Sequence, residues 1–284
     1  MTEKLIINAA ITGMVPRKSD NPNVPIFPAE IAADARRCVD AGASILHLHA
    51  RDANGNPTPD PAVYREILQC VREACPDVIL CVSTSGRTHP SFEDRSAVLT
   101  LTAPKPEMAS LTLGSMNFAR QASMNAPDMI RDLALKMREN RIVPECEIFD
   151  LGMAEYANYL IKQQILQPPF YANILLGNLG TLGATEQNLQ LVVNALPPQI
   201  TWAAAGIGRF QQTANSLAIH LGGHVRIGLE DNLWYDHART IHASNPTLIE
   251  RLVKLAHSLG RTPASPTQTR QLIGLPAPAP ISGA

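Results

Sequence analysis

The chain has 284 residues, of which 45% are hydrophobic and 17% are charged, and its formal net charge is −1. This composition is typical of a globular protein, and the near-neutral balance excludes a general nucleic-acid binder, which would carry a basic excess. No apolar run reaches the roughly 18 residues that a membrane span requires. The five cysteines form no Cys-x-x-Cys pair, and the N-terminal "MTEKLIINAAITG" lacks a signal-peptide pattern, so we expect reduced thiols and a cytoplasmic location.

Short apolar runs alternate with longer segments of helical periodicity along the whole chain. Strands are predicted at residues 5–12, 44–49, 78–83, 108–113, 142–148, 171–176, 200–205 and 224–229. Helices are predicted between them at residues 28–43, 60–77, 126–140, 152–165, 185–196, 212–223 and 246–260, and the weakest helical pattern covers residues 92–101. Strand–helix alternation implies parallel strands with crossover helices, and eight such units match a (β/α)8 TIM barrel.

An open doubly wound sheet is the alternative architecture for this alternation. Such a sheet normally carries a Gly-x-Gly-x-x-Gly turn after its first strand, whereas this sequence reads "ITGMVPRK" there. We therefore expect one catalytic barrel domain over residues 1–272. The remaining residues, 273–284, read "IGLPAPAPISGA", and this Pro- and Ala-rich tail should be extended or disordered and could lie on a neighbouring subunit.

Two histidines end the second predicted strand, in the stretch "SILHLHARD". His47 and His49 are two positions apart, so their side chains share one face of a strand. Two imidazoles with a carboxylate from another strand make a divalent-metal site, and the nitrogen-rich set favours zinc. Glu230 is the expected carboxylate, because the eighth strand closes against the first, which neighbours the second. Glu145 and Glu147 are rival carboxylates, and the alternative interpretation is a metal-free pair of hydrogen-bonded histidines.

Other polar residues follow the remaining strands, where barrel enzymes carry their catalytic groups. "STSGR" at residues 83–87 is either a binding loop or a capped turn, and "GIGR" at residues 206–209 is either a phosphate site or a tight turn. Arg209 beside exposed backbone N–H groups would suit a phosphate. The candidate substrate or cofactor contacts are Thr12, Val15, Ser110, Thr112, Gly206, Gly208 and Arg209, and Arg226 and Asp231 come from the eighth strand.

Five segments together resemble the β-keto acid cleavage enzymes: "NAAITGMVPRKSDNPNVPI", "AGASILHLHARDANGNP", "KPEMASLTLGSMNF", "WAAAGIGRFQ" and "GGHVRIGLEDNLWY". The resemblance runs from about residue 5 to residue 271, and the order and spacing are kept through all eight units. "HLHAR" followed far downstream by "GLEDN" is a specific combination. The family implies a zinc-bearing (β/α)8 barrel, usually a homotetramer, that converts a β-keto acid and acetyl-CoA into acetoacetate and a new acyl-CoA.

The resemblance also implies roles for individual residues. It places the zinc ligands on His47, His49 and Glu230, the catalytic group on Ser83, Arg226 and Asp231, and a further acidic residue on Glu147. Ser110 and Thr112 occupy positions that hold Thr and Asn in the member that cleaves 3-keto-5-aminohexanoate.

The implied chemistry suits these residue types. Zinc would bind the keto and carboxylate oxygens and stabilise the enolate formed on deprotonation. Asp231, oriented by Arg226 and Ser83, is the candidate base, and the division of proton transfer between Asp231 and Glu147 stays open. The carbanion would then attack the thioester of acetyl-CoA, and Ser/Thr hydroxyls or backbone donors would hold the oxyanions.

One position departs from the aminohexanoate enzyme, in which a Glu meets the substrate's ammonium group. Val15 stands there in this chain and cannot pair with a cation, so we expect a neutral β-keto acid, or secondly a diacid that reaches Arg17 or Lys18. The alternatives from other classes are a zinc-dependent aldolase or hydrolase on the same barrel, and a binding protein without catalysis.

Overall fold

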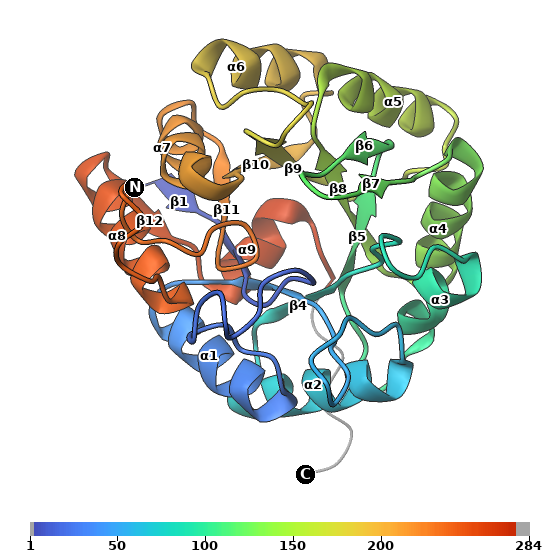
Figure 1. Cartoon of the computed structure of the whole chain (residues 1–284). Helices are drawn as coiled ribbons and strands as arrows, with labels where there is room; N and C mark the ends of the chain where they lie inside the picture. Colours follow the sequence, from blue (N-terminus) through green and yellow to red (C-terminus); the bar gives the residue numbers. More distant parts are fainter. Residues whose placement is uncertain (1–2, 277–284) are drawn as a thin grey trace.

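The computed structural model describes residues 3–276 of the chain. Eight parallel strands close into a barrel in the order β10-β11-β2-β3-β4-β5-β8-β9, which confirms the predicted TIM barrel over the doubly wound sheet. Figure 1 looks along this barrel, with the helices arranged around it. The barrel strands are β2 (Ile7–Ala10), β3 (Ile45–Leu48), β4 (Ile79–Val82), β5 (Met108–Thr112), β8 (Val143–Ile148), β9 (Tyr171–Leu176), β10 (Thr201–Gly206) and β11 (His224–Ile227).

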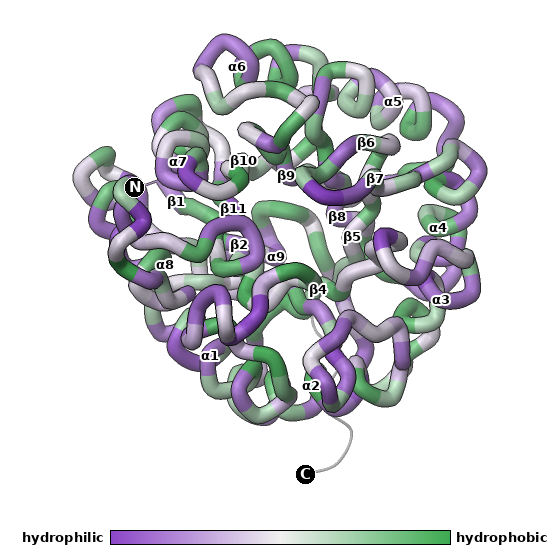
Figure 2. The backbone as a smooth tube through the Cα atoms, viewed as in Figure 1, coloured by the Kyte–Doolittle hydropathy of each residue, from purple (hydrophilic) through white to green (hydrophobic). Residues whose placement is uncertain are grey.

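All the helices except the last, α9, follow the predicted segments, and they begin where the sequence provides helix starts. Asp60 and Ser244 accept hydrogen bonds from the first turns of α2 and α8, and a proline begins α1. The helices are α1 (Pro28–Asp40), α2 (Pro61–Ala74), α3 (Phe92–Ala97), α4 (Pro127–Glu139), α5 (Leu151–Lys162), α6 (Glu186–Ala195), α7 (Gln211–His220), α8 (Asn245–Ser258) and α9 (Pro266–Ile273). Figure 2 shows hydrophobic and hydrophilic segments alternating along outer helices such as α1 and α5.

The structure departs from the predicted elements at both ends of the domain. The first predicted strand is divided, because β1 (Glu3–Leu5) pairs with β12 (Arg261–Pro263) in a separate sheet, and only β2 joins the barrel. A short hairpin of β6 (Met116–Asn117) and β7 (Ala122–Ser123) follows β5. The helix α9 ends at Ile273, one residue past the expected domain boundary, and the division at residue 272 stays a prediction. Residues 277–284 lie outside the described residues, so the extended tail stays a prediction.

The amino end of the barrel is closed by an apolar cluster. Ile45, Ile79 and Tyr171 begin their strands there and pack in one buried cluster with Ile273 and Leu275, which come from α9 and the residues after it. Because this end is filled with apolar side chains, the buried polar residues of the strands gather toward the carboxyl ends. All five cysteines are free thiols. Within residues 3–276, no helix is both long and apolar enough to cross a membrane.

His224 generates a prediction about stability and pH. Its Nδ1 accepts a hydrogen bond from the backbone N–H of Ile6 at 3.1 Å, and burial, aided by nearby Arg261, lowers its pKa to about 3. An unfolded histidine titrates near 6.5, so the unfolded chain binds a proton that the folded chain rejects between these pH values. The unfolding free energy should therefore fall by up to about 1.4 kcal/mol per unit as the pH drops below 6.5.

The variant His224→Asn keeps an acceptor for the Ile6 N–H but cannot titrate, so its stability should fall less steeply between pH 6.5 and pH 4. Denaturant unfolding at several pH values measures the two slopes. Exposed His257→Asn is the control and should match the parent chain. Equal slopes for the parent chain and His224→Asn would contradict this role of His224.

Candidate active site at the carboxyl ends of the strands

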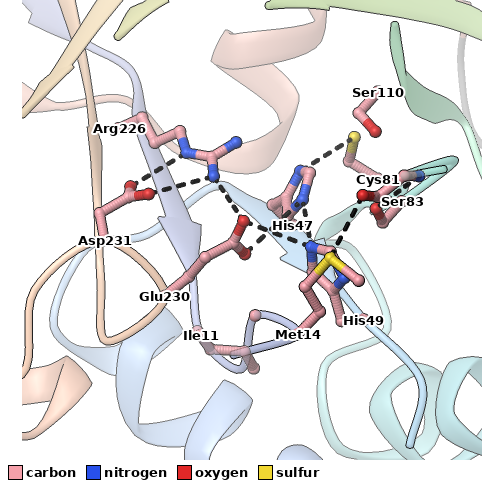
Figure 3. A network of polar contacts seen from close by, with 12 residues as sticks. Ile11, Met14, His47, His49, Cys81, Ser83, Ser110, Arg226, Glu230 and Asp231 are labelled. Carbon is pink, nitrogen blue, oxygen red and sulfur yellow. Dashed lines mark hydrogen bonds and ion pairs between the residues drawn. The ribbon is translucent and has the colours of Figure 1, made fainter. Parts of the chain in front are cut away.

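The two predicted histidines converge with one carboxylate. His47 comes from β3 and His49 follows it, and their Nε2 atoms lie 3.2 Å apart. Glu230, which follows β11, places Oε1 at 3.3 Å from His49 Nε2 and Oε2 at 3.7 Å from His47 Nε2. Figure 3 shows Glu230 between the histidines and Arg226. Among the described residues, the buried Glu230 Oε2 has no hydrogen-bond partner. These three side chains offer ligand atoms close enough together to hold one metal ion.

Glu145 orients His47 from the opposite side of the ring. Its Oε2 lies 2.6 Å from His47 Nδ1, and its Oε1 accepts hydrogen bonds from the side-chain amides of Asn8 at 2.5 Å and Asn173 at 2.8 Å. Burial works against charge on both groups, but their attraction outweighs it: the pKa of His47 rises to about 9 and that of Glu145 falls to about 2. The contact with Glu145 places a proton on Nδ1, and Nε2, which faces His49 and Glu230, is the nitrogen that would bind a metal after losing its own proton.

A second cluster, His47 with Cys81 and Glu145, also brings ligand atoms together. Burial, reinforced by Glu145, raises the pKa of the Cys81 thiol well above its usual value, so the thiol stays protonated and is a poor ligand. Both oxygens of Glu145 are already engaged, as described above. The set of His47, His49 and Glu230 is therefore better suited to a metal, and Glu145 acts behind it.

Arg226, on β11, connects four acidic residues in the barrel. Its Nε lies 3.1 Å from Asp231 Oδ2, its Nη1 3.0 Å from Glu147 Oε1, and its Nη2 2.8 Å from Glu230 Oε1. Glu145 Oε2 lies farther away, at 3.9 Å from Nη1. The guanidinium is only 1% exposed. Four carboxylates thus surround one arginine, and this excess of buried negative charge suits a bound cation.

Glu230 and Asp231 are adjacent in sequence but differ electrostatically. Burial raises the pKa of both carboxyls, and His49, Arg226 and His47 more than offset this for Glu230, whose pKa falls well below its usual value. Asp231 is bonded to Arg226 by both oxygens, yet burial and the neighbouring Glu230 leave its pKa raised. Asp231 therefore has the higher proton affinity of the two, as a general base requires.

The remaining predicted contacts are only partly brought together. Thr112 donates its hydroxyl to Glu147 Oε2 at 2.6 Å, which connects it to the Arg226 network. Thr12 is buried, and its Oγ1 has no hydrogen-bond partner within residues 3–276. Ser110 instead accepts a hydrogen bond from the Thr84 N–H at 3.1 Å, on the β4 side.

Ser83 was expected to orient Asp231 together with Arg226. Its Oγ accepts a hydrogen bond from the Ser85 N–H at 3.2 Å, and no bond joins it to Arg226 or Asp231 among the described residues. The structure therefore brings Arg226 and Asp231 together, while Ser83 lies with His49 along a cavity of about 30 Å³. The sequence motif alone could not reveal this, because a strand-end serine can turn toward either neighbour.

The "GIGR" segment forms a tight turn against the loop that carries Asp231. Gly208 has φ +60°, and its N–H donates to the Asp231 carbonyl at 2.7 Å, so this N–H is not free for a phosphate as we expected. A Cβ on Gly206 would lie 2.2 Å from the Phe210 carbonyl oxygen, so only glycine fits there. Arg209 is exposed at the edge of the same face.

Val15, predicted to meet the far end of the substrate, is 55% exposed, whereas its neighbour Met14 is buried. Met14 reaches inward, with its sulfur 3.2 Å from Ser85 Oγ, and lines the small cavity beside His49. Sequence reasoning missed Met14, because an apolar residue in a loop gives no functional signal. Lys18 forms an ion pair with Glu30 at 2.9 Å, so it is already paired.

Arg87 adds a positive charge near the site. Its guanidinium lies 4.0 Å from the centre of the Phe118 ring, in the β6–β7 hairpin. Within residues 3–276 it makes no hydrogen bond and no ion pair. Burial lowers its pKa, and the charges of Glu230 and Glu147 partly offset that effect.

Comparisons with known proteins agree with this geometry. The sequence profile of the beta-keto acid cleavage enzymes matches residues 4–275. The 3-keto-5-aminohexanoate cleavage enzyme of Fusobacterium nucleatum is 40% identical over 276 residues, which cover 97% of this chain and 99% of that protein. The 3-oxoadipate:acetyl-CoA acetyltransferase of Cupriavidus necator is 37% identical over 280 residues, covering 98% and 97%. The apo structure of ObcA shares the fold, with a TM-score of 0.77 and 22% identity over 89% of this chain and 66% of that longer chain.

The central position of Arg226 generates a prediction about stability. Replacing it in Arg226→Met leaves several buried carboxylates without their cation, which should lower the unfolding free energy by about 3–5 kcal/mol. Denaturant unfolding of chelator-treated protein measures the change. Arg36→Gln, which removes an exposed ion pair with Asp40, is the control and should lower the unfolding free energy far less. Equal losses in the two variants would contradict the central role of Arg226.

Proposed function

Because this chain belongs to the beta-keto acid cleavage enzyme family, we propose that it is an acyltransferase that converts a β-keto acid and acetyl-CoA into acetoacetate and a new acyl-CoA. The observation that carries the proposal is the Asp231 carboxylate, buried and held by Arg226 beside the cluster of His47, His49 and Glu230. The names of several relatives, such as the acetyltransferase from Cupriavidus necator, support acetyl-CoA as the co-substrate. The expected homotetramer and cytoplasmic location stay predictions.

We propose that His47, His49 and Glu230 hold zinc. The unpartnered Glu230 Oε2 and the two facing Nε2 atoms support this, because a cation would satisfy all three donor groups. A zinc ion there would supply a Lewis acid for the carbonyl and carboxylate oxygens of the substrate. Glu145 would fix the tautomer of His47 from behind, as outer carboxylates do at zinc-bound histidines.

Asp231 is proposed to take the proton from the α-carbon of the β-keto acid. Its raised pKa favours proton uptake, and the two hydrogen bonds from Arg226 fix its direction. Arg226 also contacts Glu147, so protonation of Asp231 would change the electrostatic environment of Glu147. Glu147, held by Thr112, is the second candidate for moving a proton.

In the proposed steps, one carbon–sulfur bond and one carbon–carbon bond break, and one bond of each kind forms. The deprotonated α-carbon attacks the acetyl carbonyl of acetyl-CoA, and the CoA thiolate leaves. The thiolate then adds to the former keto carbon, and the bond between that carbon and the α-carbon breaks. The new acyl-CoA departs, and the carbanion of acetoacetate takes back the proton that Asp231 had removed. The relatives' names favour this reaction over a zinc-dependent aldolase or hydrolase, neither of which needs acetyl-CoA.

We further propose a substrate without an amino group. Val15 offers no carboxylate for an ammonium group, and the unpaired Arg87 would repel one. A guanidinium that contacts the face of an aromatic ring can still offer its N–H groups to a carboxylate. Arg87 therefore favours a β-keto diacid over the neutral acid that was the first expectation, and it replaces Lys18 as the proposed partner of the second carboxylate.

Metal analysis tests the ligand set. Protein purified without chelator should contain about one zinc per chain, and the variants His47→Ala/His49→Ala and Glu230→Gln should lose it because they remove ligands. The matched control is Asp231→Asn, one residue away, which should keep zinc while activity falls by about 100-fold or more. Retained zinc in the double histidine variant would refute the site. If Asp231→Asn loses zinc and Glu230→Gln keeps it, Asp231 is the metal ligand and Glu230 is the base.

A substrate panel assayed with acetyl-CoA tests the specificity. A β-keto diacid should be turned over better than a neutral β-keto acid, and 3-keto-5-aminohexanoate should be the poorest, because its ammonium group would meet no carboxylate at Val15 and the like charge of Arg87. In Arg87→Gln, kcat/KM for the diacid should fall by about tenfold or more while that for the neutral acid changes little. Efficient turnover of the amino substrate by the parent chain would show that Val15 and Arg87 do not set specificity.

A further inference from the structure

A second hollow, of about 390 Å³, lies beside the proposed active site. It is bounded by the first turns of α7, by the loop after β11 and by α8. Figure 1 shows these elements as neighbours on one side of the barrel. The residues that define it are Arg209, Asn232, Trp234, Tyr235, Arg239 and Arg251, and we call it the arginine pocket. Its volume is in the range of small-molecule sites.

The three arginines of the arginine pocket come from three separate segments and carry uncompensated charge. Arg209, Arg239 and Arg251 form no ion pair with any carboxylate among residues 3–276. Asp236 also lines the pocket and pairs with none of the three arginines, because its oxygens accept hydrogen bonds from the Thr240 hydroxyl at 2.7 Å and the Ile241 N–H at 2.8 Å. The arginine pocket is therefore a concentration of positive charge in a chain whose net charge is −1.

Aromatic rings accompany these charges. The guanidinium of Arg251 lies 4.5 Å from the centre of the Tyr235 ring, and Trp234 packs against His242 with ring centres 4.7 Å apart. Fixed aromatic rings offer a surface on which a purine base can stack. Arginines bind phosphate oxygens through paired N–H donors. Phosphate-binding and base-stacking groups in one hollow match a phosphorylated nucleotide.

The arginine pocket adjoins the loop that carries Asp231. Asn232, on its wall, directly follows Asp231, and Gly208 donates its N–H to the Asp231 carbonyl. The Arg239 guanidinium reaches the same turn, because a Cβ on Gly208 would lie 4.0 Å from its Nη2 atom. A ligand anchored by these arginines could therefore extend a chain toward Asp231.

We propose that the arginine pocket binds the 3′-phospho-ADP end of the CoA thioester. Its three arginines contact the phosphate groups, its aromatic residues contact the adenine, and the pantetheine arm runs past Asn232 toward Asp231. This inference rests on the proposed function for the identity of the co-substrate. The charge and shape of the pocket would equally attract a free nucleotide, so the test must separate the two sources.

Calorimetric binding to the full chain, without any β-keto acid, tests the assignment independently of turnover. CoA should bind more tightly than dephospho-CoA, and pantetheine alone should bind weakly, because it lacks the phosphates. In the exposed double variant Arg209→Gln/Arg239→Gln, CoA affinity should fall by about tenfold or more while pantetheine binding stays the same. Arg65→Gln, an exposed arginine on α2, is the control and should bind CoA like the parent chain.

Unchanged CoA affinity in the double variant would overturn the proposal, and so would ATP binding to the pocket in preference to CoA. Kinetics adds a second readout: the preference for acetyl-CoA over acetyl-pantetheine, as a ratio of kcat/KM values, should shrink by about tenfold in the double variant and stay constant in Arg65→Gln. If the chain binds CoA as expected but never turns over acetyl-CoA, then the proposed function is refuted, while CoA binding by the arginine pocket remains supported.

Discussion

The buried guanidinium of Arg226 is the interaction on which the site depends. It is the permanent cation that three carboxylates share: Glu147 on β8, and Glu230 and Asp231 in the loop after β11. Carboxylates at this depth would repel one another and take up protons without such a partner. Arg226 therefore keeps several acidic groups charged and fixed in direction within one small volume, as a site for carbanion chemistry requires.

Glu230 and Asp231 have different surroundings, and these surroundings suit them to different roles. Glu230 faces two imidazoles and keeps a buried oxygen unpartnered, whereas Asp231 faces Arg226 with both oxygens and keeps a raised pKa. The same fold thus presents a metal-binding carboxylate and a basic carboxylate on consecutive residues. Gly13 permits this arrangement, because a Cβ at that position would lie 2.8 Å from Glu230 Cγ.

The sequence predicted the elements whose pattern is local and repeated. Strand–helix alternation gave the barrel, and the spacing of His47 and His49 gave their shared face. It failed where backbone turns decide the direction of a side chain. The strand ends at Ile227, and the turn after it brings both Glu230 and Asp231 to Arg226, which no alternation rule specifies. Met14 and α9 were missed, because contacts distant in sequence determine their roles.

The central claim is that a carbon nucleophile formed beside Asp231 attacks the acetyl group of acetyl-CoA. The most direct measurement supplies acetyl-CoA with carbon-13 in both acetyl carbons and follows the products of one turnover with a β-keto acid by mass spectrometry. Both labelled carbons should appear in acetoacetate, and the new acyl-CoA should carry none. Label that stays in the thioester, or that leaves as free acetate, would contradict it.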